Sequence, residues 1–225
     1  MTRLCATNWL GILGVIIALL VAGTGPMQAY GQNSGAQTNG GLTHEEGKAA
    51  FDAGKFDQAR KIWIPLADAG DASSQFSLAL LYKNALGIKR DDSKAAFWFE
   101  RAAEKGMTDA QKMIGLLYFS GTGVPRNLDK SARFYEMAAQ SGDAEAQYML
   151  ANLYRQGKGV ELNFEQAARW YEAAAKQGDI AAQSNLARLY MEGVGVPQDY
   201  RQAVYWFEQA AFKGDRDAQF GLGEL

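Results

Sequence analysis

From about residue 43 onward, apolar and polar residues alternate with the period of an α-helix. In one segment the helix-spaced positions at offsets 0, 3, 4 and 7 are Gln75, Leu78, Ala79 and Tyr82, which line one helix face. A second segment follows, in which Ala95, Ala96, Trp98, Phe99, Ala102 and Ala103 stand at similar helical spacing. The pattern predicts pairs of helices in which the first helix packs on the second.

This two-helix pattern repeats along the chain with a period of 36 residues and without a slip of register. Three columns of the repeat are nearly invariant, and we interpret them as structural positions. The glycines are Gly70, Gly106, Gly142, Gly178 and Gly214; the tyrosines are Tyr82, Tyr118, Tyr154 and Tyr190; the glutamines are Gln75, Gln111, Gln147, Gln183 and Gln219. A fourth column stays small (Ala79, Gly115, Ala151, Ala187 and Gly223), which predicts a close approach of a neighbouring helix. A period of this length is typical of solenoids and other repeat arrays.

Helix starts and ends fall at matching places in each unit. The repeated glycines suit the left-handed position that ends a helix, and most are followed by an aspartate that suits the cap of the next helix (Asp71, Asp143, Asp179 and Asp215). A second column of caps precedes the second helices (Asp91, Asn127, Asn163 and Asp199). Thr43 and Glu46 have the spacing of a capping box, so the first helix is predicted to begin there.

A glycine-rich loop joins the two helices of a unit, as in Gly121-Thr122-Gly123-Val124-Pro125 and Gly157-Lys158-Gly159-Val160. Such loops can cradle phosphate, but a phosphate-binding loop continues with Lys-Ser or Lys-Thr, which is missing here. The loop also recurs from unit to unit, so we interpret it as a connector.

These residues resemble the Sel1-like repeat family, which is related to the tetratricopeptide repeats. The phrase that carries the resemblance runs from Ala146-Gln147 through Tyr154, the loop Gly157-Lys158-Gly159, Trp170-Tyr171 and Ala174-Ala175 to Gly178. The resemblance implies an all-α fold, an α-solenoid coiled into a right-handed superhelix. The solenoid is expected over residues 43–225: a short first unit at 43–70, four full repeats at 71–106, 107–142, 143–178 and 179–214, and a partial unit at 215–225.

The first 29 residues differ from the rest of the chain, with Arg3 as their single charge and an apolar run from Trp9 to Ala22. We interpret residues 1–29 as a signal peptide cleaved after Ala29 or after Gly31; a membrane span is the alternative, but the run is short for one. Residues 30–42 are predicted to be a flexible linker. Cys5 precedes the apolar run, so no lipid anchor is expected, and the mature chain would hold no cysteine. The protein is therefore expected in the bacterial periplasm or secreted, without stable membrane insertion.

Few residues are available for catalysis. The mature chain has one histidine, His44, which we interpret as a solvated surface residue, and no Ser-x-x-Lys stretch occurs. We expect no catalytic residues, no metal site and no cofactor. With 23 Lys and Arg against 25 Asp and Glu, no broad basic surface points to nucleic acid.

Candidate binding residues lie in the columns of the first helices that vary between units. They combine large apolar side chains with cations and would line the concave groove of the solenoid: Phe76, Lys112, Phe119, Tyr148, Asn152, Arg155, Arg188 and Met191. Such a groove suits an extended or helical peptide of acidic character.

The sequence thus predicts a non-enzymatic scaffold or regulator that binds a protein or peptide in this groove. A glycan-binding module of the cell wall is an alternative, and a β-lactamase-like hydrolase is a weaker one. Phe220, Leu222 and Leu225 could leave an apolar end, so the protein is expected to be a monomer or to self-associate weakly there.

Overall fold

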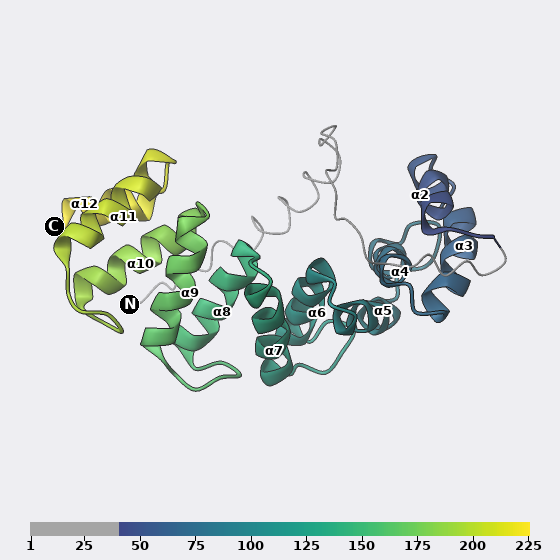
Figure 1. Ribbon diagram of the computed structural model, residues 1–225, viewed down its shortest axis with the longest axis horizontal. Coiled ribbons are helices and arrows are strands. Elements are labelled where there is room, and N and C mark those ends of the chain that lie inside the picture. Colours follow the sequence, from purple (N-terminus) through teal and green to yellow (C-terminus); the bar gives the residue numbers. More distant parts are fainter. Residues whose placement is uncertain (1–40) are drawn as a thin grey trace, which may run out of the picture. The chain divides into compact units, whose positions relative to one another are not determined.

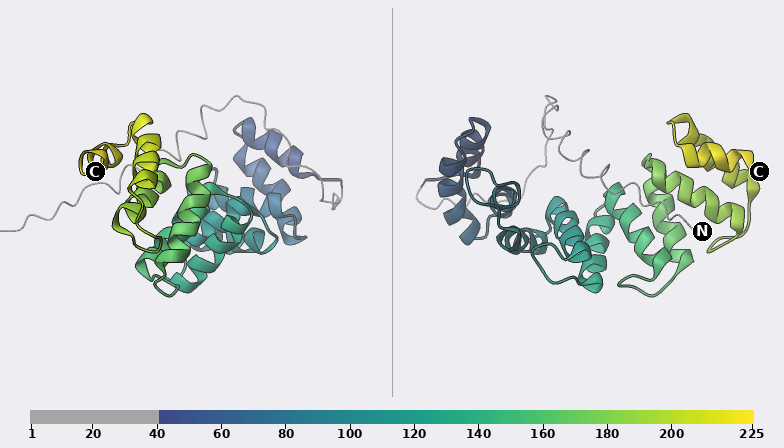
Figure 2. Two further views of the ribbon diagram at one scale, coloured as in Figure 1. Left: turned by 60° about the vertical axis from the view of Figure 1, so that its left-hand side comes forward. Right: turned by 180° about the vertical axis from the view of Figure 1, so that it is seen from behind.

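The computed structural model describes residues 41–225, which form eleven α-helices. Each helix contacts the next along the chain, so that five helix pairs stack in chain order and α12 follows the last of them (Figures 1 and 2). The pairs are α2 (His44–Asp52) with α3 (Phe56–Asp68), α4 (Ala72–Asn84) with α5 (Asp92–Glu104), α6 (Thr108–Ser120) with α7 (Leu128–Gln140), α8 (Ala144–Gln156) with α9 (Phe164–Lys176), and α10 (Ile180–Glu192) with α11 (Tyr200–Phe212); α12 is Arg216–Gly223. The signal peptide and nearly all of the linker proposed above lie outside the described residues.

The predicted helix caps are confirmed. Four aspartates accept a hydrogen bond from the backbone N–H three residues later, at 2.7 or 2.8 Å: Asp71, Asp143, Asp179 and Asp215. The caps of the second helices bond in the same way, and Thr43 and Glu46 form the reciprocal capping box. Met107 stands where α6 would have its aspartate, and α6 has no side-chain cap. Each cap satisfies a backbone donor that has no partner within the helix.

Neighbouring units are joined by a buried amide. Gln75, Gln111, Gln147 and Gln183 each donate from Nε2 to the carbonyl oxygen eight residues earlier, near the end of the preceding helix, at 2.9 to 3.2 Å. All four are buried, whereas Gln219 in α12 is exposed. Each of these hydrogen bonds lies beside the repeated glycine. The φ of this glycine is 93° at Gly142, a left-handed value that favours glycine.

The loop of each unit packs against the unit before it. The second loop glycine has a positive φ, 70° at Gly159, and a Cβ added there would overlap the carbonyl oxygen of Leu128 in the first turn of α7. Gly123 and Gly195 stand in the same relation to α5 and α9. A glycine is therefore required at this position by both backbone angle and space.

The core is built from small residues facing aromatic ones. Trp63, Phe99, Tyr135, Tyr171 and Phe207 occupy one column of the second helices and are at most 3% exposed. Gly115, in the predicted small column, would bring a Cβ to 3.2 Å from the ring of Tyr135. The close approach predicted from this column is confirmed at Gly115, and the fold is an α-solenoid of helix pairs.

Candidate partner-binding face

The first helices of neighbouring units lie close enough for their side chains to bond. Lys112 of α6 reaches Asp143, the cap of α8, at 2.9 Å, and Ser184 of α10 donates to Asp215, the cap of α12, at 3.0 Å. We use the term first-helix face for the side of α4, α6, α8 and α10 that carries the eight predicted binding residues.

Three of these residues contact one buried side chain, that of Tyr171 in α9, and a fourth acts on its hydroxyl through its charge. The Tyr171 hydroxyl donates to Asn152 Oδ1 at 2.7 Å and accepts from Arg155 Nε at 3.1 Å. The ring of Tyr148 lies 5.9 Å from the ring of Tyr171, centroid to centroid, and the charge of Arg188 on the next first helix acts on the same hydroxyl. Residues of α8 and α9 thus meet at one point of the first-helix face, and the charge of Arg188 on α10 acts on this point.

Burial controls the ionisation of Tyr171. The side chain is fully buried, and loss of solvation raises the pKa of Tyr171 to about 12, although the charges of Arg155 and Arg188 oppose the shift. The hydroxyl therefore stays protonated at neutral pH and remains the donor to Asn152.

Because the pKa of Tyr171 is higher in the folded chain than in the unfolded one, its contribution to stability is complete below pH 10 and disappears as the pH rises toward 12. We expect Tyr171→Phe to reduce the alkaline loss of unfolding free energy by about 2 kcal/mol. Urea unfolding of the parent and of Tyr171→Phe at pH 9 and pH 11.5 measures this loss of unfolding free energy. The difference between the two proteins at pH 7 gives the effect of the lost hydrogen bonds and is subtracted. An equal loss of unfolding free energy at alkaline pH in both proteins would contradict a raised pKa for Tyr171.

Lys112 is in a different electrostatic state from the two arginines. Its ammonium lies 2.9 Å from Asp143, 3.1 Å from Glu145 and 3.6 Å from Asp109. Partial burial lowers the pKa of Lys112, but the hydrogen bond to Asp143 and the charge of Glu145 outweigh it and raise the pKa above its ordinary value. This part of the face holds three carboxylates for one cation, whereas Arg155 and Arg188 are exposed and form no ion pair within residues 41–225.

The remaining predicted binding residues, Phe76, Phe119 and Met191, are half-buried, and each contacts other side chains of the solenoid. Phe76 meets Phe99 edge to face at 5.4 Å between ring centroids, and Lys158 Nζ lies 5.8 Å from the ring centroid of Phe119. Met191 packs against the core near α10. These three side chains are already packed within the solenoid, and the exposed part of each is available to a binding partner.

The repeated tyrosines lie at the boundary between core and surface. Tyr82 and Tyr118 are buried, whereas Tyr154 and Tyr190 are half-buried. The Tyr118 hydroxyl donates to Glu100 at 2.8 Å, across to the second helix of the preceding unit. In every unit that has the loop, the tyrosine carbonyl accepts from the backbone N–H of the cap residue that starts the second helix.

The prediction that His44 is a solvated surface residue is wrong. Its side chain is 24% exposed, stacks on Trp63 at 5.6 Å between ring centroids, and approaches Ser74 Oγ at 3.2 Å through Nδ1. Burial lowers the pKa of His44, with Asp71 opposing the shift. His44 therefore joins α2 to both α3 and α4, a role its sequence neighbours do not reveal.

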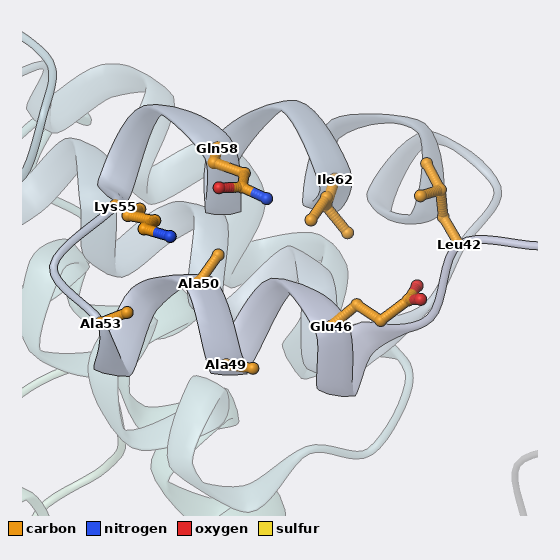
Figure 3. Close-up of a pocket in the computed structure, with 8 residues that line it drawn as sticks. All are labelled: Leu42, Glu46, Ala49, Ala50, Ala53, Lys55, Gln58 and Ile62. Carbon is orange, nitrogen blue, oxygen red and sulfur yellow. The ribbon is translucent and has the colours of Figure 1, made fainter.

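Two further surfaces lie at the ends of the stack. A shallow pocket between α2 and α3 is lined mainly by short apolar side chains such as Ala49, Ala53 and Ile62, with Glu46 and Lys55 at its edge (Figure 3). At the other end Phe212 is 94% and Phe220 69% exposed. Self-association through the latter end stays a prediction.

None of the helices between residues 41 and 225 has the length and apolar character needed to cross a membrane. Over the same residues, His, Cys, Asp and Glu side chains form no group of three that could hold a metal ion.

Comparison with known proteins identifies the repeat. The family model described as Sel1 repeat matches residues 72–107, 108–143, 144–179 and 180–215. The solved structure of a Sel1 repeat protein from Oxalobacter formigenes is 31% identical with a TM-score of 0.75, and the match covers 81% of this chain and 75% of that one.

A second solved structure is that of a protective antigen present in uropathogenic Escherichia coli strains and displaying an SLR fold. It is 34% identical with a TM-score of 0.75, and the match covers 80% of this chain but only 40% of that one. No curated protein matches the chain. The four matched repeats, in the register of the observed helix pairs, show that the chain belongs to the Sel1 repeat family.

Proposed function

We propose that this protein is an exported scaffold that binds a protein or peptide of acidic character on its first-helix face. Sel1 repeat proteins are in general protein-interaction scaffolds. The observation that carries the proposal is the cluster that Tyr148, Asn152 and Arg155 form with Tyr171, together with the positive charge of Arg188 that acts on the same hydroxyl. Aromatic residues combined with arginine are the usual composition of contact anchors between proteins.

Export is the second part of the proposal. Residues 1–29 would serve as a signal peptide and residues 30–42 as a linker between the cleavage site and the solenoid, which would place the mature protein in the periplasm or outside the cell. The E. coli relative is a protective antigen, which is compatible with a protein that leaves the cytoplasm.

Position-specific photo-crosslinking tests the binding face. A benzoylphenylalanine placed at Tyr148 reports on the first-helix face, and the same group placed at Arg169 of α9 reports on an exposed position of a second helix. We expect a crosslinked polypeptide from the Tyr148 position that is absent from the Arg169 position and that survives digestion of the cell wall.

Equal crosslinking from both positions, or from Arg169 alone, would contradict the proposed face. A product that disappears when the cell wall is digested would instead support a glycan-binding module. Circular dichroism of both variants must first show the helix content of the parent.

A further inference from the structure

The two exposed arginines of the first-helix face differ in how firmly they are held. Arg155 donates its Nε–H to the Tyr171 hydroxyl, whose own proton is directed to Asn152. Since Tyr171 is fully buried, this bond fixes the base of the Arg155 guanidinium to the core. Its two terminal nitrogens carry four further N–H donors, and these have no partner within the described residues.

Arg188 supplies the second set of donors. It stands 36 residues after Asn152, at the same position of the next first helix. α10 follows α8 as the next first helix of the stack, and the positive charge of Arg188 acts on the Tyr171 hydroxyl in the same direction as that of Arg155. Arg188 forms no hydrogen bond or ion pair within residues 41–225, so all five of its N–H donors are free of protein acceptors.

An unpaired arginine alone would be an ordinary surface residue. Arg169 on α9 is also exposed and unpaired, but no buried hydroxyl holds it. The pair on the first-helix face combines two positive charges with one donor group that is already oriented. Such preorganisation lowers the entropy lost when a ligand binds.

We propose that Arg155 and Arg188 together bind a carboxylate of the partner, with Tyr171 and Asn152 as positioning residues for Arg155. This inference rests on the proposed function and deepens it, because it names the group that anchors the partner. A planar guanidinium matches the two oxygens of a carboxylate in a bidentate bond. Aspartate, glutamate and the chain terminus supply carboxylates in any unmodified protein, whereas a phosphate requires a modified one.

The charges along the first-helix face favour binding of an acidic group at Arg155 and Arg188 over binding at Lys112. Around Lys112 the carboxylates of Asp109, Asp143 and Glu145 would repel an acidic group. The Arg155 and Arg188 pair has no such compensation within the described residues, so an acidic ligand is directed to α8 and α10.

NMR of the arginine Nε–H signals in the mature chain tests the site with three small organic probes and with inorganic phosphate, all at constant ionic strength. N-acetyl-glutamate α-amide offers a side-chain carboxylate, N-acetyl-alanine offers a terminal one, and N-acetyl-glutamine α-amide is the neutral control. We expect saturable shifts of Arg155 and Arg188 with the first two probes and none with the third. The carboxylate that binds more tightly identifies whether the partner presents a side chain or its terminus.

Arg188→Gln is the decisive variant, because Arg188 is exposed and forms no hydrogen bond or ion pair within residues 41–225, so we expect the variant to keep the parent fold. We expect it to weaken carboxylate binding at Arg155 about tenfold. Arg169→Gln is the matched control and should leave binding unchanged. Shifts that stay linear and equal at Arg155, Arg188 and Arg169 would overturn the proposal, as would tighter binding of inorganic phosphate than of either carboxylate.

The two proposals fail separately. Carboxylate binding without crosslinking from Tyr148 would leave the anion site valid and the protein-binding face wrong. Crosslinking from Tyr148 without any saturable shift would leave the scaffold in place and overturn the carboxylate site.

Discussion

Gly159→Ala is expected to lower the free energy of unfolding by about 2 to 5 kcal/mol. The left-handed backbone at Gly159, with φ of 70°, contributes about 1 to 2 kcal/mol of strain once a side chain is present. The remainder arises because the added Cβ overlaps the carbonyl oxygen of Leu128, and overpacking typically costs about 1 to 3 kcal/mol. Urea denaturation followed by circular dichroism measures the difference from the parent protein.

Gly142→Ala separates the two contributions. Gly142 has a φ of 93°, but a Cβ added there meets no atom within 4 Å. We therefore expect only the strain of the backbone, about 1 to 2 kcal/mol. If Gly142→Ala were as destabilising as Gly159→Ala, the packing of the loop on α7 would not be the reason for the second glycine.

Trp63→Ala is expected to cost about 3 to 5 kcal/mol, and the cost should be confined to the first unit. Trp63 is 2% exposed, stacks on His44, and donates from Nε1 to the His44 carbonyl oxygen at 3.2 Å. In a solenoid each unit contacts only its neighbours, so the loss should remain near α2 and α3. Hydrogen exchange resolved by peptide should show faster exchange over residues 44–68 and unchanged exchange over α8 to α11.

Trp206→Ala at the opposite end of the stack is the matched control. Trp206 is 7% exposed in α11, so its removal should speed exchange in α11 and α12 while α2 and α3 keep the rate of the parent. Faster exchange throughout the chain in either variant would indicate one cooperative unit and would contradict a nearest-neighbour stack.

The periodic pattern was sufficient to predict the helices and their ends because both depend on local chemistry. A cap such as Asp179 acts on a backbone N–H three residues away, and a glycine such as Gly142 acts through its own φ. These interactions lie within one turn of the chain, so a single sequence contains all the information they need.

The site was predictable only in part, because its centre depends on contacts between helices. The variable columns identified Asn152 and Arg155, but Tyr171 lies in a second-helix column shared with Phe99 and was not among the predicted binding residues. The one available signal was its hydroxyl, because a buried Tyr O–H usually finds a hydrogen-bond partner. His44 was misjudged for the same reason, since its packing comes from Trp63, 19 residues away.

The backward packing of each loop has a consequence for the order in which the protein forms. Gly159 covers the start of α7, so the second helix of one unit is completed only by the loop of the unit that follows it in the chain. During synthesis the amino-terminal units emerge first. The most recently made unit is therefore always incomplete, and the nascent chain carries one open end that moves forward with every 36 residues added.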